Sequence, residues 1–236
     1  DRPTVTVGCD TYSPFSYVDV DGNLTGIDIE LASEAFSRMG YEPEFTIINW
    51  EEKKDLLHNG DIDCVWSSFT MDGREDEYRW AGPYMRSHQV VAVNVDSDIY
   101  TLQDLEDKVM AVQSSTKPED IIRSHDGTLP QLRKVISVQK RDLLFALLGK
   151  GYADALAAHD TSVEQFMAES GLEFRILDQP LLTVGLGVAF DKDDTRGLNT
   201  KLDEVLKEMK ADGTTRAVLS EYMSDPDQYL EGGDES

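Results

Sequence analysis

The segment WSSFTMDGR, residues 66–74, places two serines and a threonine ahead of an arginine. An arginine guanidinium can hold both oxygens of a carboxylate, and hydroxyl or backbone donors at the end of a strand can complete the ring of hydrogen bonds. The alternative is a polar turn in which Arg74 pairs on the surface with the acidic residues that follow it, Glu75, Asp76 and Glu77. A carboxylate site is therefore one of two interpretations of this segment.

A second polar segment, QSSTKPED at residues 113–120, has the composition of a turn between a strand and a helix. Ser115 and Thr116 lie in this turn, where helix amides and hydroxyls can bind a carboxylate. Lys117 follows them, and it could either face an acidic side chain of a ligand or simply be solvated.

Patterns typical of catalysis are absent from the sequence. We find no Ser/His/Asp order at a known spacing, no HExxH and no GxxxxGK[ST]. Four histidines are scattered over both halves: His58, His88, His125 and His159. His159 stands beside Asp160 and could in principle serve as an acid or base, but we expect no catalytic residue and a protein that is not an enzyme.

The two cysteines, Cys9 and Cys64, lie in no CxxC or Cys/His cluster, so we expect no metal site and no cofactor. Both fall in apolar runs that read as strands, which favours two small buried side chains. A disulfide is possible only if those two strands are neighbours.

The composition argues against two classes of partner. With 46 acidic and 22 basic residues the net charge is −24, whereas nucleic acids and anionic lipid surfaces both require a basic patch. A hydrophobic content of 40% is typical of a folded globular protein. No apolar run approaches the roughly 18 residues of a membrane span. The chain begins at Asp1 without a methionine or signal segment, so we expect a mature or trimmed fragment.

Strand and helix patterns alternate twice along the chain, which predicts an α/β fold with parallel strands. In the first half, strands are predicted at residues 4–9, 44–50 and 62–68, a short hairpin at 18–23, and helices at 28–40, with Asp28 as N-cap, and 51–60. The alternation restarts near residue 108, with strands at 108–112, 133–138, 153–158, 174–177 and 181–190 and helices at 118–125, 141–151 and 162–171. Two final helices are predicted at 198–209 and 214–223.

The second unit is complete near residue 185, so we expect GLGVAF, residues 185–190, to cross back to the first unit. This crossing predicts a discontinuous lobe 1, residues 1–92 plus 187–236, and a lobe 2, residues 93–186. A cleft between two domains joined by strands is a natural site for a small ligand.

Several segments, taken in order, resemble landmarks of one family. They are TVGCDTYSPFSYVDVDGNLTGIDIELASEA, Trp50 followed by GDIDCVWSSFT, WAGPYMRSHQVVAV, VMAVQSSTKPED, YADALAAHD and LDEVLKEMKADGTTRAVLSEYM. Together they resemble the extracytoplasmic solute-binding proteins of family 3, the polar amino acid-binding receptors of ABC importers. The resemblance covers nearly the whole chain and implies the type II periplasmic binding protein fold, with two α/β lobes joined by a two-strand hinge.

In lobe 1, the resemblance implies that Arg74 binds the carboxylate of a free amino acid. The remaining residues implied for this lobe are donors and aromatic walls for the ligand side chain: Ser67, Ser68, Thr70, Asp10, Tyr12 and Trp50. Trp66 lies inside the third strand, and we expect it in the core. The segment departs from the family in one place, because TMDGR is one residue shorter than the common spacing and Gly73 replaces the usual glutamate.

In lobe 2, the resemblance implies an aspartate that binds the ligand's ammonium group. The segment DALAAHD offers Asp154, His159 and Asp160, and the two aspartates are six positions apart where a spacing of five is usual. We favour Asp160, because an ammonium group requires a carboxylate and a neutral imidazole offers one lone pair. In the alternative, His159 faces the ligand and Asp160 caps the following helix. The turn residues Ser115, Thr116 and Gln113 complete the set.

The expected function is extracytoplasmic binding of a free amino acid by closure of the two lobes, with delivery to an ABC importer. A polar, uncharged side chain is expected, because the predicted pocket lacks a clear second carboxylate for a basic one. The alternative is a ligand-sensing domain of a membrane histidine kinase or related receptor. The tail EGGDES, residues 231–236, fits excision of such a sensor and equally fits a lipoprotein whose tether was removed. We expect a monomer in the periplasm or at the cell surface, partnered by a permease or, in the alternative, by an attached transmembrane kinase.

Overall fold

The computed structural model describes residues 1–230, which divide into two compact units. Unit 1 comprises Asp1–Arg86 and Val184–Ser236, and unit 2 comprises Ser87–Thr183. The divisions thus fall at 86/87 and 183/184, whereas the sequence predicted 92/93 and 186/187. The tail EGGDES and the end of the predicted lobe 1 lie outside the described residues.

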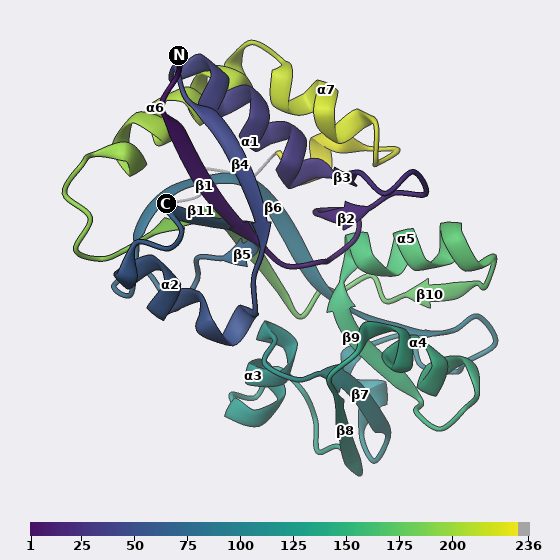
Figure 1. The fold of residues 1–236 in the computed structure, drawn as a ribbon. Helices are drawn as coiled ribbons and strands as arrows, with labels where there is room; N and C mark the ends of the chain where they lie inside the picture. Colours follow the sequence, from purple (N-terminus) through teal and green to yellow (C-terminus); the bar gives the residue numbers. More distant parts are fainter. Residues whose placement is uncertain (231–236) are drawn as a thin grey trace. The chain divides into compact units, whose positions relative to one another are not determined.

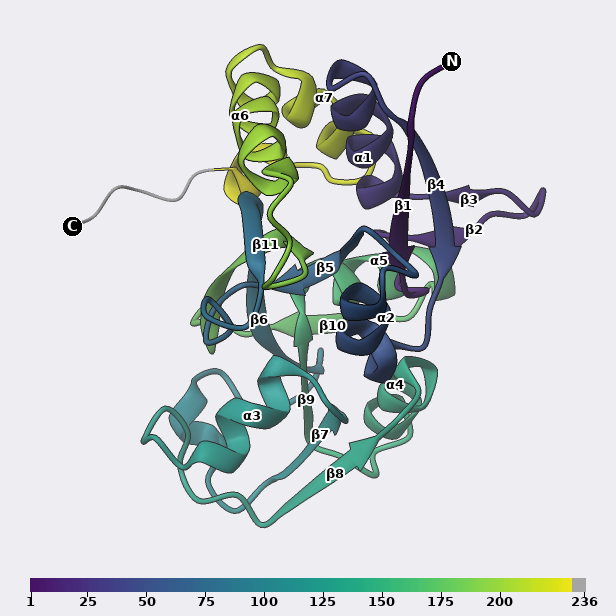
Figure 2. The same cartoon turned by 60° about the vertical axis from the view of Figure 1, so that its left-hand side comes forward.

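Unit 1 is built on parallel strands (Figures 1 and 2). β1 (Thr4–Cys9) lies between β4 (Glu42–Ile47) and β5 (Cys64–Thr70), and it pairs in parallel with both. On the other side of β5, β11 (Leu182–Phe190) pairs antiparallel, with Leu186 opposite Thr70. The smaller elements are the hairpin β2 (Tyr17–Val18) and β3 (Leu24–Thr25), the 3-10 helix η1 (Trp50–Glu52) and α2 (Lys53–Asn59).

Three helices pack together in unit 1: α1 (Ile27–Arg38), α6 (Leu198–Ala211) and α7 (Thr214–Ser220) (Figure 1). The apolar residues of α1 recur at helical spacing and are buried, as the sequence predicted. A short 3-10 helix, η3 (Pro226–Tyr229), follows α7.

The prediction that Asp28 caps α1 is wrong. The N-cap is Gly26, whose φ of 128° is available only to glycine, and a Cβ there would lie 2.3 Å from the Phe15 carbonyl oxygen. The helix therefore begins two residues earlier than expected, and Asp28 lies in its first turn, where it is fully buried.

Unit 2 repeats the parallel arrangement. β7 (Val109–Gln113) pairs in parallel with β8 (Lys134–Val138) and β9 (Ala155–His159). β6 (Arg79–Asn94) pairs antiparallel with β9 and, through its last residues, with β10 (Phe174–Ile176). The connecting helices are η2 (Leu102–Leu105), α3 (Lys117–Ser124), α4 (Arg141–Gly149) and α5 (Asp160–Ser170).

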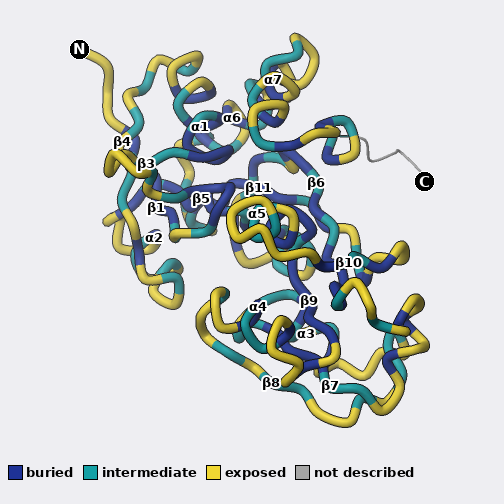
Figure 3. Tube along the Cα trace, turned by 90° about the vertical axis from the view of Figure 1, so that its right-hand side faces the viewer, coloured by how far each residue is buried: buried dark blue, intermediate teal, exposed yellow. Residues whose placement is uncertain are grey.

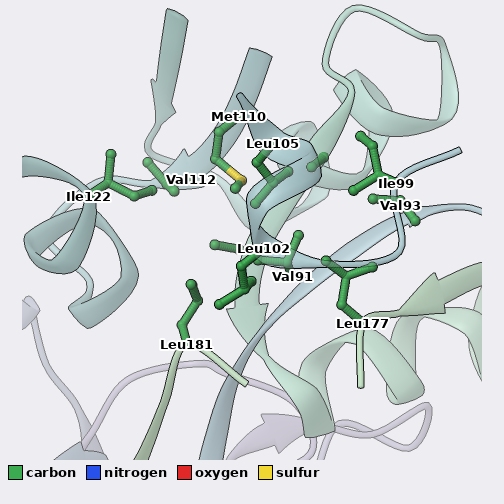
Figure 4. Close-up of a cluster of buried hydrophobic side chains, with 12 residues drawn as sticks. Val91, Val93, Ile99, Leu102, Leu105, Met110, Val112, Ile122, Leu177 and Leu181 are labelled. Atoms are coloured by element: carbon green, nitrogen blue, oxygen red, sulfur yellow. The ribbon is translucent and has the colours of Figure 1, made fainter. Parts of the chain in front are cut away.

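The sheet of unit 2 is buried on both faces, as expected for parallel strands covered by helices. Met110 and Val112 of β7 point into a cluster with Leu102, Leu105 and Ile122 (Figure 4). The residue between them, Ala111, belongs to a second cluster with residues of α4 and α5. In Figure 3, β9 and the unit 2 part of β6 are accordingly mostly dark blue, whereas the edge strand β8 is teal and yellow and the later turns of α5 are exposed.

β6 and β11 each contain residues of both units. β6 is 16 residues long and begins in unit 1. No strand was predicted for residues 79–94, a segment that mixes proline, charged and polar residues with its apolar ones.

Cys9 and Cys64 lie on the neighbouring strands β1 and β5, yet both are free thiols. Both are fully buried, which confirms the expectation of small core side chains. Burial raises the pKa of the Cys9 thiol to about 12 and also raises that of Cys64, so both are protonated near neutral pH. None of the helices among residues 1–230 combines the length and apolar composition that a membrane span requires. The predicted mixed α/β fold is confirmed.

Candidate functional site

The carboxyl ends of parallel neighbouring strands meet at one edge of a sheet, and such edges carry ligand sites in α/β proteins. In unit 1 this edge carries the residues at or just beyond the ends of β1, β4 and β5. We call the following set the unit 1 edge: Asp10, Tyr12, Trp50, Ser67, Ser68, Thr70 and Arg74. The corresponding set in unit 2 follows β7 and β9, and we call it the unit 2 edge: Gln113, Ser115, Thr116, His159 and Asp160.

The end of β5 is held by hydrogen bonds from two directions. The hydroxyl of Ser67 accepts from the backbone N–H of Asp10 at 2.9 Å, which joins the ends of β5 and β1. Ser68 adopts a φ of 42°, and its N–H donates to Oδ2 of Asp28 at 2.7 Å. The left-handed backbone at Ser68 is strained for a residue other than glycine, so the Asp28 carboxylate fixes a conformation that the strand would not adopt alone.

Asp28 is a residue that sequence reasoning assigned to the wrong role. Its Oδ1 accepts from the Tyr84 hydroxyl at 2.6 Å, and both side chains are buried. Burial raises the pKa of Asp28 to about 7, against the lowering effect of the Tyr84 and Ser68 hydrogen bonds. A signal existed in the sequence, since Asp28 stands between two isoleucines, and a carboxylate buried among apolar residues needs hydrogen-bond partners.

Arg74 stays close to the end of β5 despite the shortened loop. Its N–H donates to the Met71 carbonyl at 2.9 Å, which closes a β-turn with Gly73 at the third position, at a φ of 80°. Glycine is favoured there because the position requires a positive φ. The guanidinium Nη1 lies 3.4 Å from the Thr70 carbonyl oxygen, so the departure from the family spacing is absorbed within a tight turn.

Among residues 1–230, the structure does not show the surface ion pair that was the alternative interpretation of Arg74. Glu77, one of its three proposed partners, pairs with Lys54, with 2.5 Å between Oε1 and Nζ. Arg74 is half-buried, and its Cζ lies 5.6 Å from the centroid of the Phe69 ring. Within the described part of unit 1, Arg74 forms no ion pair.

An aromatic cluster stands beside Arg74. Phe69 is 3% exposed, and its ring centroid lies 4.9 Å from that of Trp50, 5.3 Å from Tyr78 and 5.0 Å from Trp80. Trp50 itself is half-buried and begins η1, where the Asn49 side chain accepts from the Glu51 N–H. Lys53, which sequence reasoning did not include, lies over the Trp50 ring, with 4.6 Å between Nζ and the centroid.

The other aromatic residues of the prediction occupy two different environments. Tyr12 is half-buried and stacks on Phe15 at a centroid distance of 5.9 Å. Trp66 is fully buried against Phe36 and Tyr84, which confirms it as a core residue.

In unit 2, Asp160 is the first residue of α5 and is 6% exposed. Its Oδ1 accepts from the Thr161 N–H at 2.8 Å. Burial raises the pKa of Asp160 to about 6, and His88 nearby opposes the rise. A buried carboxylate that is still ionised at neutral pH is an effective partner for an ammonium group.

His159 faces β6. Its Nδ1 lies 2.6 Å from the Ser87 hydroxyl and 3.2 Å from Nε2 of Gln89, and these two partners are fully buried. Burial lowers the pKa of His159 to about 4, so the ring is neutral at pH 7. Sequence reasoning missed Ser87 and Gln89, because they lie on a strand that it did not predict.

Asp154, the other aspartate of the segment, accepts from the Val109 N–H at 2.8 Å. This bond joins the start of β9 to the start of β7, at the opposite ends of the strands from Asp160. Asp154 therefore belongs to the scaffold of unit 2 and not to its edge.

The turn after β7 is held by its own polar groups. The Thr116 hydroxyl donates to the Gln113 carbonyl at 2.6 Å, and the Gln113 amide donates to the Gln139 carbonyl at 3.1 Å. Ser115 has a φ of 61°, and its N–H donates to Oε1 of Glu119 at 3.2 Å. The backbone N–H of Ser115, just before the N-cap of α3, is thus engaged by the protein's own carboxylate.

The chain matches the family model of bacterial extracellular solute-binding proteins, family 3, over residues 5–225. It is 24% identical over 232 residues to the glutamate-binding protein GluB of Corynebacterium efficiens, covering 90% of this chain and 76% of GluB. It is 28% identical to the putative amino-acid ABC transporter-binding protein PatH of Vibrio harveyi, covering 88% of this chain and 83% of PatH.

Among solved structures, the fold is similar to that of an ABC uptake transporter substrate-binding protein from Streptococcus pneumoniae with bound histidine. The TM-score is 0.84 at 22% identity, covering 94% of this chain and 93% of the other. This similarity establishes the type II periplasmic binding protein fold, and the matched family model is one of solute-binding proteins. The chain therefore belongs to the bacterial extracellular solute-binding proteins of family 3.

Proposed function

We propose that this protein binds a free amino acid outside the cytoplasm and delivers it to an ABC importer. The observation that carries the proposal is the opposite chemistry of the two edges: half-buried Arg74 at the unit 1 edge and buried Asp160 at the unit 2 edge. An amino acid zwitterion presents one carboxylate and one ammonium group, which require a cation and an anion respectively. GluB and PatH, by their names, are a glutamate-binding protein and a putative amino-acid ABC transporter-binding protein.

In this proposal, Arg74 binds the ligand carboxylate together with Ser67, Ser68 and Thr70. Asp160 binds the ammonium group, while His159 stays against Ser87 and Gln89. Tyr12 and Trp50 provide flat faces for the ligand side chain, since aromatic faces hold aliphatic or cationic stems equally well. Asp10, Gln113, Ser115 and Thr116 line the remainder of the proposed site.

We further propose that a monomer acts by closure of its two lobes over the ligand. A ligand shifts an open–closed equilibrium only by the difference between its affinities for the two states. Contacts made to both lobes exist only in the closed state, so a ligand that bridges Arg74 and Asp160 would supply that difference. A permease then recognises the closed form.

A thermal-shift screen of the twenty amino acids tests the proposal. The protein is first unfolded and refolded to remove any co-purified ligand, and hits are measured by isothermal titration calorimetry. A ligand at about 1,000 times its Kd stabilises the folded state by about 4 kcal/mol, or a rise of roughly 8–16 °C in Tm for a chain of this size. The sequence alone favours a polar, uncharged side chain, and a screen of all twenty amino acids compares such ligands directly with acidic and basic ones. The proposal is wrong if no amino acid raises Tm.

The alternative role, a sensor domain of a membrane receptor, would use the same binding site. An assay in membrane vesicles that contain the cognate permease and ATPase distinguishes the two roles. As an importer receptor, the ligand-loaded protein should stimulate ATP hydrolysis in those vesicles, whereas a sensor domain should leave it unchanged.

A further inference from the structure

Two cations lie on the aromatic cluster of unit 1. Nζ of Lys53 is 4.6 Å from the centroid of the Trp50 ring and 5.6 Å from that of Phe69. Cζ of Arg74 is also 5.6 Å from the Phe69 centroid. Lys53 is the first residue of α2 and Arg74 follows β5, so the tertiary fold brings the two together.

Seven other basic residues among residues 1–230 form ion pairs with acidic side chains: Arg38, Lys54, Arg123, Arg133, Arg196, Lys207 and Arg216. Within residues 1–230, neither Lys53 nor Arg74 forms an ion pair in its unit, although acidic residues outnumber basic ones by 46 to 22. The adjacent lysine, Lys54, pairs with Glu77. Lys53 instead donates to the Trp50 carbonyl at 3.2 Å.

The two cations also act on each other. The pKa of Lys53 is lowered, first by burial and second by Arg74, and the nearby Glu51 only partly opposes this. Packing of the lysine stem on Trp50 explains why Lys53 lies there. It does not explain why a second, unpaired cation is held beside it, since like charges repel. An anionic ligand would relieve this repulsion.

We propose that Lys53 and Arg74 together bind a ligand with two carboxylates, so that the amino acid has an acidic side chain. The proposal rests on the proposed function, in which Arg74 binds the ligand's main carboxylate. Lys53 lies on Trp50, the proposed wall for the side chain, and it is placed to bind the second carboxylate. The acidic residue of the same edge, Asp10, accepts from the Thr11 N–H with its Oδ1. This assignment replaces the uncharged side chain that the sequence alone favoured.

Calorimetry with matched pairs of ligands tests the assignment. Glutamate is compared with glutamine, and aspartate with asparagine, on the unmodified protein and on Lys53→Met. Methionine keeps the length and the apolar stem that packs on Trp50, and it removes the charge. We expect the unmodified protein to bind the better acid about tenfold or more tightly than its amide. In Lys53→Met, the affinity for the acid should fall about tenfold, while the affinity for the amide should change by less than about threefold.

Two further variants act as controls. Lys54→Met removes an exposed lysine that already pairs with Glu77, so the preference for the acid should remain. Lys53→Arg keeps the charge and should retain most of the preference, which an effect of packing alone would not produce. Circular dichroism and Tm confirm that each variant is folded.

The results separate this inference from the proposed function. If the protein binds an amide as tightly as the corresponding acid, or if Lys53→Met weakens both equally, the inference is overturned while amino-acid binding stands. If no amino acid binds, both are overturned. A preference for the acid that disappears in Lys53→Met and persists in Lys54→Met supports the inference.

Discussion

The two units build their edges from the same topology and fill them with opposite chemistry. Each edge collects the residues that follow parallel strands. The unit 1 edge combines cations with aromatic rings, through Arg74, Lys53 and the cluster around Phe69. The unit 2 edge combines a buried carboxylate, Asp160, with a neutral imidazole, His159. The comparison indicates that the strand ends supply position, while the side chains after them determine which end of a ligand each unit binds.

The two units also differ in how the protein stabilises the charged groups at their edges. In unit 1 the cations lie on ring faces, which attract positive charge without neutralising it. In unit 2 the carboxylate of Asp160 lies at the first turn of an 11-residue helix, where the helix dipole and the Thr161 N–H stabilise a negative charge. Each unit thereby holds a charge that is ready for a ligand group of opposite sign.

The largest effect is expected from the cation of unit 1. Arg74→Ala should weaken amino-acid binding by about 100- to 1,000-fold, because truncating one partner of a charged hydrogen-bonded pair leaves the other without compensation. Calorimetry measures the loss, and Tm without ligand should change little. Arg133→Ala removes an exposed arginine that pairs with Asp107 and should leave affinity unchanged. Unchanged affinity in Arg74→Ala would remove Arg74 from the site.

The anion of unit 2 should give the next effect. Asp160→Asn should weaken binding by about 10- to 100-fold, because the ammonium group loses its anionic partner. With a pKa of about 6 in the folded protein, Asp160 is protonated as pH falls, so affinity should drop about tenfold between pH 7.5 and pH 5. Asp160→Asn should abolish this pH dependence. Retention of the full pH dependence in the variant would assign it to another group.

Asp160→Asn should also increase the stability of the ligand-free protein. The folded pKa of about 6 lies above the ordinary 3.8, so the folded state binds more protons between those values. This group's contribution to stability therefore falls as pH rises through that window. At pH 7, ligand-free Asp160→Asn should be more stable by about 1–3 kcal/mol, measured by urea unfolding. A loss of stability would mean that contacts of the carboxylate outweigh its burial.

His159 should affect stability at low pH and leave binding nearly unchanged. Its pKa is lowered from 6.5 to about 4, so the unfolded state binds more protons in that window, and stability is lost as pH falls through it. His159→Gln can keep a hydrogen bond to Ser87. Between pH 7 and pH 4.5, the free energy of unfolding of this variant should fall by about 2 kcal/mol less than that of the protein with His159. Since Asp160 contributes the opposite slope, the measurement is made in the Asp160→Asn background. Weaker binding in His159→Gln than in Asp160→Asn would show that the imidazole binds the ligand.

The smallest effect is expected from the turn after β7. Thr116→Val removes a hydroxyl that donates to the Gln113 carbonyl, and binding should weaken by roughly 2- to 10-fold. Calorimetry with the best ligand measures it. A loss as large as that of Arg74→Ala would move the main carboxylate contact to unit 2.

The sequence predicts the order of elements well because each strand and helix carries its own periodicity. It also places Ser67 to Arg74 at a strand end, since the apolar run stops there. It misassigned Asp28, because the helix start was judged from a local capping residue. The N-cap is instead Gly26, where a Cβ would collide with the Phe15 carbonyl oxygen, a contact outside the helix. Lys53 was missed for a similar reason, since it begins helix α2 and its second aromatic partner, Phe69, lies on strand β5.

β6 shows a different limit of prediction from local sequence patterns. Ser87 and Gln89 are buried polar residues on a strand that belongs to both units, and their partner His159 is 72 and 70 residues away in sequence, respectively. No local pattern identifies such a pair. Pairing between distant strands, and not propensity, makes this segment extended.

The central claim is that the unit 1 edge binds the ligand carboxylate through Arg74. Calorimetry with the best amino acid and its α-carboxamide, each on the unmodified protein and on Arg74→Ala, tests it most directly. We predict that the unmodified protein prefers the free carboxylate by about a hundredfold, and that Arg74→Ala binds the two compounds with affinities within about threefold of each other. If Arg74→Ala still prefers the free carboxylate by a hundredfold, another group binds it and the claim is wrong.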